Sequence, residues 1–358
     1  MIDNLTYSKE WIEKLKSQKD ISINPPVLEK LIYALSLVEQ LVLENLDFIF
    51  KGGTSLILLQ NDFNRFSIDV DIITSETNER IDEVLERICK KGTFSSFNLE
   101  DRKSNIGKIP KSHYKIQFNS LYNIQSSFIF LDVLFEKSPY PIILSLPIKS
   151  KWLSVSQPLV SVSVPSKESI FGDKLTAFAP NTTGIQYAKG KELEIIKQLH
   201  DLGTLFSFHL NLDVLIKSFK NNVINEMYYR EIGDNPTLVL NDIIETSLMI
   251  ARRDNNKSEP SISQFEEIKR GLQSFKSYTI MNMFRIEDAI LASSKVSFLA
   301  SLIISNKISS MNIIESDNYM LINIENQEFN FLNKLKKTNL SAFSFWVETL
   351  KNLGKIIY

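Results

Sequence analysis

Asp69 and Asp71 stand two residues apart in the segment 67–73, where acidic and apolar residues alternate. Such alternation has the period of a β-strand, and residues two apart in a strand face the same side of a sheet. Two adjacent carboxylates repel each other, and a divalent cation between them relieves that repulsion. Ligands that offer only oxygen suit hard ions such as Mg²⁺. The pair therefore predicts a metal-binding position, although a solvated strand face would show the same pattern.

A glycine pair, Gly52 and Gly53, lies between an apolar run at 48–50 and an expected helix at 54–60. Glycine lets the backbone approach a ligand closely, and the free N–H groups at the start of a helix attract phosphate. The segment that begins at Lys51 therefore predicts a phosphate-binding turn. A tight strand-to-helix connection without a ligand is the alternative interpretation.

A phosphate-binding turn and a metal-binding carboxylate pair are what nucleotidyl transfer requires, because a hydroxyl group attacks the α-phosphate of a nucleotide and pyrophosphate leaves. A third carboxylate on a neighbouring strand usually completes such a site. Asp132 fits this role because it stands in the apolar run 128–135, where an acid is expensive to bury unless it is paired or bound to a metal. Glu136 lies on the same face of that expected strand, so the third carboxylate is Asp132 or Glu136.

Four segments, taken in order, resemble the abortive-infection nucleotidyltransferase toxins of the AbiEii/AbiGii family, within the polymerase-β-like nucleotidyltransferases. The first two are KGGTSL at 51–56 and RFSIDVD at 65–71, and the last two are DKLTA at 173–177 and KQLHDL at 197–202. Residues 203–358 match no motif of that family.

The resemblance implies a role for each matching residue. Mg²⁺ would be bound by Asp69, Asp71 and Asp132. Lys174 would neutralise phosphate charge, and Asp201 would be a further acid of the active site. The catalytic set would then consist of Asp69, Asp71, Asp132, Lys174 and Asp201, and the NTP would be held by Gly52, Gly53, Thr54, Arg65, Ser67 and Lys174.

Two features depart from the family pattern. Gln198 stands where the family often has an acid, and the spacer from 178 to 196 is longer than the compact pattern. Both features put the geometry around Asp201 in question and leave the Asp69–Asp71 pair untouched. Lys174 also has a simpler interpretation, as a residue on the exposed side of an amphipathic helix.

The elements that must position these residues change character near residue 165. Before it, expected strands at 48–50, 67–73, 113–120 and 127–136 alternate with helices, and a proline-rich β-like stretch follows. After it, helical periodicity dominates, apart from a β-like stretch at 312–331. Together with the resemblance, this predicts an α+β protein with a polymerase-β-like nucleotidyltransferase domain and mixed sheet over 1–165. A mostly helical bundle domain over 166–358 would contribute Lys174 and Asp201 to the site.

Charge and cysteine content limit the class of protein. The chain has 358 residues with 41 Lys and Arg against 42 Asp and Glu, so its net charge of −1 does not indicate a nucleic-acid partner. The run at 102–115 has five basic residues and no acid; it is a solvated hairpin or a surface that follows a nucleic-acid backbone. The single cysteine, Cys89, excludes an intramolecular disulfide and has no zinc-ligand spacing with His113 or His209.

No secretory signal is expected at the start of the chain, and Lys295 interrupts the most apolar stretch, so we expect a cytoplasmic protein without a membrane partner. The resemblance implies an Mg²⁺-dependent enzyme that moves NMP from an NTP to an acceptor hydroxyl, at a tRNA 3′ end in some members. It also implies a type IV toxin whose nearby-encoded antitoxin need not bind it. The alternatives are a small-molecule or protein acceptor, and a non-catalytic nucleotide-binding module.

Overall fold

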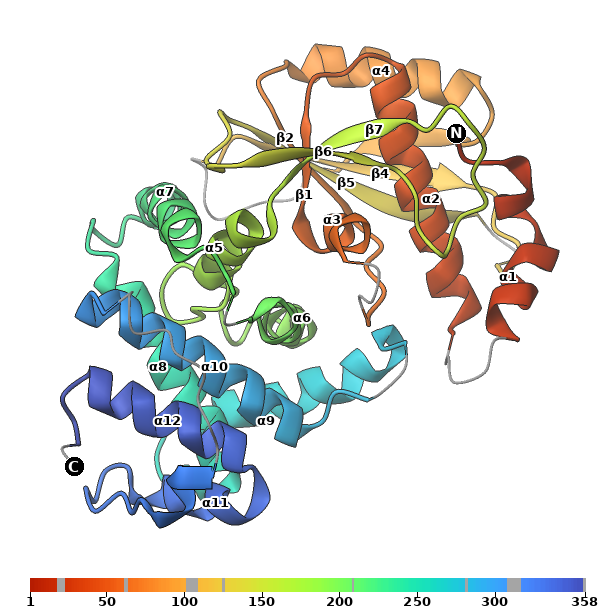
Figure 1. The fold of residues 1–358 in the computed structure, drawn as a ribbon. Helices are drawn as coiled ribbons and strands as arrows, with labels where there is room; N and C mark the ends of the chain where they lie inside the picture. Colours follow the sequence, from red (N-terminus) through yellow and green to blue (C-terminus); the bar gives the residue numbers. More distant parts are fainter. Residues whose placement is uncertain are drawn as a thin grey trace. The chain divides into compact units, whose positions relative to one another are not determined.

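A computed structural model describes residues 1–17, 23–60, 64–100, 109–123, 126–207, 209–280, 283–307 and 317–356. Its internal contacts divide the chain into two compact units (Figure 1). Unit 1 comprises Met1–Ile170 and Ser277–Met283, and unit 2 comprises Phe171–Lys276 and Phe284–Tyr358. Unit 1 combines a sheet with helices and unit 2 is helical, which confirms the predicted α+β class.

A five-stranded mixed sheet in the order β1-β2-β5-β4-β3 forms the centre of unit 1. The β2–β5 pair is parallel and the other three pairs are antiparallel. A separate antiparallel pair, β6 with β7, follows in the chain. The strands are β1 (Ile49–Lys51), β2 (Val70–Thr74), β3 (Ser96–Leu99), β4 (Lys111–Phe118), β5 (Ser127–Phe135), β6 (Ile143–Pro147) and β7 (Ser161–Pro165).

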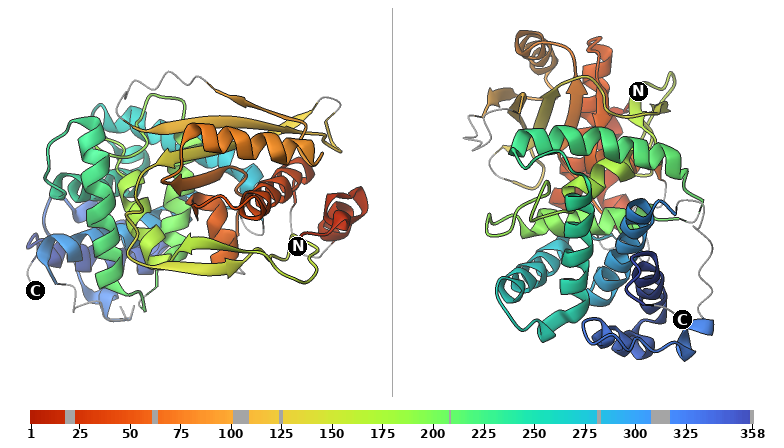
Figure 2. Two further views of the ribbon diagram at one scale, coloured as in Figure 1. Left: turned by 90° about the horizontal axis from the view of Figure 1, so that it is seen from above. Right: turned by 90° about the vertical axis from the view of Figure 1, so that its left-hand side faces the viewer.

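Two helices of unit 1, α2 and α4, pack against this sheet (Figures 1 and 2). α2 begins at Pro25, where a missing N–H is harmless, and α4 begins after Thr77, whose side chain accepts from the N–H of Arg80. The ring of Tyr33 on α2 stacks on Phe118 with a centroid distance of 3.7 Å. The remaining bounds are η1 (Asn4–Tyr7), α1 (Lys9–Lys16), α2 (Pro25–Leu43), α3 (Gly52–Leu59) and α4 (Asn78–Lys90).

Burial alternates along β4 and β5 because only one face of the sheet packs against α2 and α4. Tyr114, Ile116, Ile129 and Leu131 are fully buried, whereas the residues between them are half-buried. Buried apolar side chains of this kind each contribute about 1.5–3 kcal/mol of transfer free energy. The half-buried face is the one on which the candidate site lies.

The helices of unit 2 pack closely through small residues. A Cβ on Gly172 of α5 would lie 2.6 Å from the carbonyl oxygen of Leu215, and a Cβ on Gly203 would lie 2.7 Å from the Cβ of Ala292. Figure 2 shows α10 and α12, in blue, side by side. The elements are α5 (Lys167–Ala177), α6 (Glu192–Leu205), α7 (Leu212–Arg230), α8 (Thr237–Arg252), η2 (Arg253–Asn255), α9 (Ser261–Phe275), η3 (Lys276–Tyr278), α10 (Ile286–Ser305), η5 (Asp317–Leu321), η6 (Asn330–Lys334), α11 (Leu335–Thr338) and α12 (Leu340–Asn352).

The expectation of a β-like stretch at 312–331 was wrong over the described part of that range. There η5 and the start of η6 occur instead of a strand, and residues 312–316 lie outside the described residues. By length and composition α10 is apolar enough to cross a membrane, yet 67% of its most apolar window is buried inside the structure. Helices in protein cores pass the same test, so α10 is weak evidence for a membrane span.

Candidate active site

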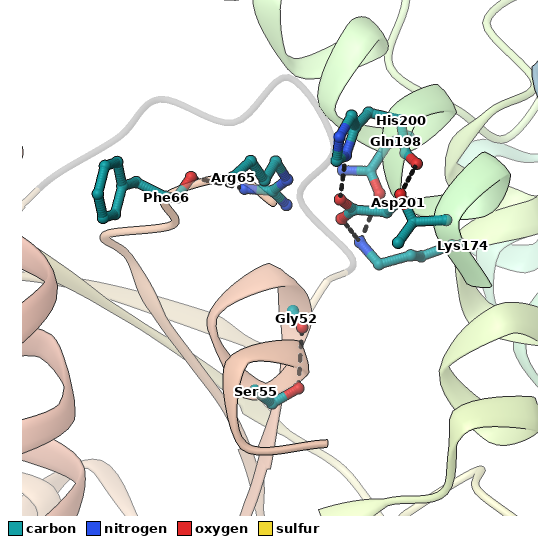
Figure 3. Close-up of polar contacts among 9 residues, drawn as sticks. Gly52, Ser55, Arg65, Phe66, Lys174, Gln198, His200 and Asp201 are labelled. Atoms are coloured by element: carbon teal, nitrogen blue, oxygen red, sulfur yellow. Dashed lines mark hydrogen bonds and ion pairs between the residues drawn. The ribbon is translucent and has the colours of Figure 1, made fainter. Parts of the chain in front are cut away.

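The glycine pair opens α3 itself, whereas the sequence placed it before the helix. Gly52 has a φ of +75°, a region that favours glycine, and a Cβ there would lie 2.1 Å from Oδ2 of Asp71. The first turn is closed by Ser55, whose hydroxyl donates to the carbonyl of Gly52 at 2.9 Å (Figure 3). The start of α3 therefore lies directly against the carboxylate of Asp71, where only glycine leaves room.

Gly53 brings two further predicted residues to the same place. A Cβ on Gly53 would lie 2.3 Å from Nη2 of Arg65 and 2.9 Å from the hydroxyl oxygen of Ser67. Arg65 is only 2% exposed, and its Nη1 donates to the carbonyl of Phe66 at 3.0 Å (Figure 3). Arg65 thus holds the loop beside the glycine turn, and its expected contact with the NTP stays a prediction.

Asp69 precedes β2, so the expected strand over 67–73 was wrong at its start. The backbone at 65–66 pairs with a distant segment, because Arg65 bridges Thr279 and the N–H of Phe66 donates to the carbonyl of Tyr278 at 2.8 Å. The hydroxyl of Thr54 donates to the carbonyl of Asp69 at 2.5 Å. Thr54 is fully buried, so its side chain ties α3 to this loop, and its expected contact with nucleotide stays a prediction.

Four charged or titratable residues form a row across the half-buried face of the sheet. Lys51 on β1 pairs with Asp71 on β2, Asp71 pairs in parallel register with Asp132 on β5, and Asp132 pairs with His113 on β4. Register partners project from the same face, with backbones about 4.8 Å apart. Glu136 follows the end of β5, about 13 Å further along the chain direction. The register therefore favours Asp132 over Glu136 as the third carboxylate.

His113 was set aside in the sequence as lacking zinc spacing, yet its Nδ1 lies 2.6 Å from Oδ1 of Asp132. The alternation of 111–118 placed His113 on one face of a strand, but only the β4–β5 register brings it to Asp132. Lys30 on α2 also lies near the acids. Burial lowers the pKa of Lys30, and the charge of Asp69 opposes that shift. Sequence periodicity offered no signal for Lys30.

Lys174 and Asp201 form a buried ion pair inside unit 2. Nζ of Lys174 lies 2.7 Å from Oδ2 of Asp201 and donates to Oε1 of Gln198 at 3.0 Å (Figure 3). Nδ1 of His200 lies 3.5 Å from the other oxygen of Asp201. Lys174 is 5% exposed, so its interpretation as a residue on a solvated helix face was wrong. Gln198, which departs from the family motif, accepts a hydrogen bond from Lys174 and leaves the Lys174–Asp201 ion pair intact.

The structure thus gathers the predicted residues in two groups, one in each unit. In unit 1 the group contains Gly52, Gly53, Arg65, Ser67, Asp69, Asp71 and Asp132. In unit 2 it contains Lys174 and Asp201. That both groups serve one reaction stays a prediction.

Asp71 and Asp132 suit a hard divalent cation, because they present neighbouring oxygen donors. Among the described residues, no three His, Cys, Asp or Glu side chains are gathered to enclose a metal ion. Mg²⁺ in nucleotide-handling sites is held by one or two carboxylates, water and the substrate phosphates, and seldom by a cage made of protein alone. The donor set of this site therefore fits Mg²⁺ that arrives with a nucleotide.

Comparison with known proteins decides the family. A family model described as "Nucleotidyl transferase AbiEii toxin, Type IV TA system" matches residues 36–267, which is more than half of the chain. The chain belongs to the AbiEii nucleotidyl transferase toxin family. The resemblance found in four short segments is confirmed, and the match extends past residue 202 into α7, α8 and α9.

No curated protein matches the chain. Among solved structures, "JHP933 from Helicobacter pylori" is 16% identical, with a TM-score of 0.43, and the match covers 80% of this chain and 97% of that one. An "antigenic nucleotidyltransferase-like protein from Paracoccidioides brasiliensis" is also 16% identical, with a TM-score of 0.33, covering 57% and 89%. Assignment to the AbiEii family rests on the family model and not on these two structures.

Proposed function

We propose that this AbiEii family member is an Mg²⁺-dependent nucleotidyltransferase that moves NMP from an NTP to the 3′-terminal hydroxyl of an RNA, with tRNA as the acceptor. The observation that carries the proposal is the register pairing of Asp71 with Asp132, beside a glycine turn that leaves no room for a side chain. Membership of the type IV toxin family implies a cognate antitoxin. We propose that the protein acts in the cytoplasm without binding that antitoxin directly.

The residues of unit 1 have different proposed roles in the reaction. The N–H groups at the start of α3 and the hydroxyl of Ser67 hold the triphosphate. Asp69, Asp71 and Asp132 hold Mg²⁺, which supplies charge neutralisation for the attacking and leaving oxygens when it is bound. Asp132, which His113 contacts, would accept the proton of the acceptor hydroxyl.

The balanced reaction forms one bond and breaks one. The acceptor oxygen bonds to the α-phosphorus, the bond from that phosphorus to the bridging oxygen of pyrophosphate breaks, and pyrophosphate leaves with the electron pair. The hydroxyl proton passes to a base, for which we propose Asp132. Lys174 and Asp201 remain proposed participants, with Lys174 as a phosphate-neutralising charge.

The test is transfer of label from each α-labelled NTP to a tRNA mixture in the presence of Mg²⁺. Asp71→Asn and Asp132→Asn should each lower the transfer rate by about a hundredfold or more, since both remove an oxygen donor of the site. Glu136→Gln is the matched control, because it removes a neighbouring acid outside the row of register partners. Absence of label in any RNA, or an Asp71→Asn variant as active as the wild type, would contradict the proposal.

The same experiment separates the rival functions. Label in protein or in an added small molecule, but not in RNA, would establish a different acceptor. NTP affinity that is independent of Mg²⁺ and of both Asp69 and Asp71, with no transfer at all, would establish a non-catalytic nucleotide-binding module. Neither rival is favoured by a contact of the described residues.

A further inference from the structure

The sheet face that carries Asp132 continues along β4 and β5 into two phenylalanines and a lysine. Phe128 and Phe130 share the alternation of Asp132, and their rings make a T-shaped contact with centroids 5.1 Å apart. Lys115 on β4 is the register partner of Phe130. These side chains are half-buried, whereas Ile129 between them is 2% exposed against the helices. An aromatic and basic surface therefore adjoins the proposed site.

Two ammonium groups meet on one of these rings. Nζ of Lys115 lies 4.4 Å and Nζ of Lys30 lies 4.5 Å from the centroid of Phe128. Such contacts hold a cation in place, yet two like charges on one ring repel each other. Within the described part of the chain, neither ammonium forms a salt bridge with a carboxylate. An anion beside the ring of Phe128 would be attracted by both lysines, of which Lys30 also faces the charges of Asp69 and Glu29.

The position of this surface indicates which phosphate it takes. This step rests on the proposed function, in which the triphosphate occupies the α3 side of the carboxylates. In-line displacement requires the acceptor hydroxyl to approach from the side opposite the leaving pyrophosphate. β1 and α3 lie at one edge of the Asp71–Asp132 pair, and β4 lies at the other. Lys115 on β4 is therefore on the acceptor's side of the pair, and Phe130 on β5 is its register partner.

We propose that Lys30, Lys115, Phe128 and Phe130 form an acceptor platform that binds the single-stranded 3′ end of the acceptor RNA. Lys30 and Lys115 contact phosphates of the strand, and the half-buried ring of Phe130 stacks on a base. Phe128 holds the two ammonium groups. Aromatic rings beside a basic strip are the usual means of binding single strands without reading sequence, because every base offers a π-face. Phe128 lies about 13 Å from Asp132 along β5, a span of two or three nucleotides.

Part of the basic run expected at 102–115 bears on this surface. Lys111 and Lys115 lie in β4, on the same alternating face as His113. Arg102, Lys103 and Lys108 lie outside the described residues. Lys115 is the only residue of this run in the acceptor platform. Lys30 comes from α2, and no sequence pattern had connected Lys30 with the run.

The experiment measures binding of a fluorescent single-stranded RNA of about 12 nucleotides to the full chain, by anisotropy over a range of salt concentrations. In the Lys30→Gln/Lys115→Gln variant, the slope of log affinity against log salt should become shallower by about 1.4, because each lost phosphate contact on a single strand removes about 0.7. Phe130→Leu should weaken binding by about tenfold and leave the slope unchanged, because it removes stacking and no charge. A blunt RNA duplex should respond to neither change.

Lys90→Gln is the matched control, because Lys90 is exposed at the end of α4, a helix that carries no residue of the platform. Thermal unfolding checks that Phe130→Leu is folded, and the lysine variant tests the platform independently of it. Equal affinities and slopes for the lysine variant, Phe130→Leu and Lys90→Gln would overturn the platform.

Label transfer from NTP is measured separately on the same variants. Transfer to RNA with unaltered RNA binding would overturn the platform and leave the proposed function standing. Loss of RNA binding in the platform variants, with no transfer by the wild type, would support the platform and contradict the proposed function.

Discussion

Nδ1 of His113 lies 2.6 Å from Oδ1 of Asp132, and Asp132 is in turn the register partner of Asp71. The contact fixes one carboxylate oxygen of Asp132 and leaves the other for a ligand. Residues that orient a metal-binding side chain commonly change metal affinity or activity by about 10–100-fold when they are replaced. We therefore regard His113 as a positioning residue for Asp132.

Replacement of His113 by Leu should raise the Mg²⁺ concentration needed for half-maximal transfer by about tenfold, because Asp132 loses the contact that orients it. The measurement is a Mg²⁺ titration of the transfer rate, with recovery expected at high Mg²⁺. His209→Leu is the control, because His209 is exposed in unit 2. A His113→Leu variant with the Mg²⁺ titration of the wild type would exclude a positioning role.

Replacement of Gly52 by Ala should lower the transfer rate by about a hundredfold, because a Cβ there would lie 2.1 Å from Oδ2 of Asp71 and must displace that carboxylate. Gly92→Ala separates this clash from backbone strain. Gly92 has a φ of +89° and open space around its Cβ position. Both variants should lose about 1–2 kcal/mol of unfolding free energy from strain, and only Gly52→Ala should lose activity. Equal activity in the two variants would show that the close approach to Asp71 is unimportant.

Removal of one partner from the buried Lys174–Asp201 pair should destabilise the protein by about 3–5 kcal/mol, because the other charge is left buried and unpaired. The double variant Lys174→Met/Asp201→Leu should regain most of that stability, since apolar residues of similar volume replace the pair. Chemical denaturation measures both effects. Label transfer then tests the predicted role, because a stable double variant should be inactive. A stable and fully active double variant would show that the pair is structural only.

Glu44 should make the stability of unit 1 depend on pH. Its carboxylate lies 2.5 Å from Nζ of Lys91 and 2.6 Å from Nε of Arg87, and hydrogen bonds from these two cations hold its pKa below the ordinary value of 4.5. A depressed carboxyl pKa gives stability that is present above about pH 4.5 and is lost as the pH falls through the folded-state value. The gain is at most about 1 kcal/mol, because both cations are more than a third exposed.

Glu44→Gln should therefore reduce the free energy of unfolding at pH 7 and reduce it less at pH 3, in denaturation measured at both values. Glu83→Gln is the control, since Glu83 is 62% exposed and its contact with Arg80 is 3.5 Å long. A difference between wild type and Glu44→Gln that is the same at both pH values would contradict the assignment.

Most of the helices and strands could be predicted, because their signals are local. The helical periodicity expected after residue 165 appears in α7 and α8, among other helices. Periodicity reports which face of a helix or strand is buried, and it needs no knowledge of distant residues. The short strand β3 was missed, because its alternation of polar and apolar residues covers only four positions, all of them half-buried or exposed.

The sequence by itself determined the types of residue that the site would use. The glycine pair, the Asp69–Asp71 spacing, the acid at position 132 and the four family segments are all readable along the chain, since each depends on residues close together in sequence. They were sufficient to identify the family that the match over 36–267 confirms.

Tertiary structure alone decided which of these residues are neighbours. Parallel pairing of β2 with β5 places Asp71 beside Asp132, and antiparallel pairing of β4 with β5 places His113 beside Asp132. The bridge from Arg65 to Thr279 pairs the segment before Asp69 with a distant part of the chain, so this segment is not part of β2. Backbone hydrogen bonds between distant segments fix each of these arrangements, and a shift of one residue would turn every side chain to the other face. The Asp69–Asp71 pair therefore acquires its third partner from a register that no local pattern encodes.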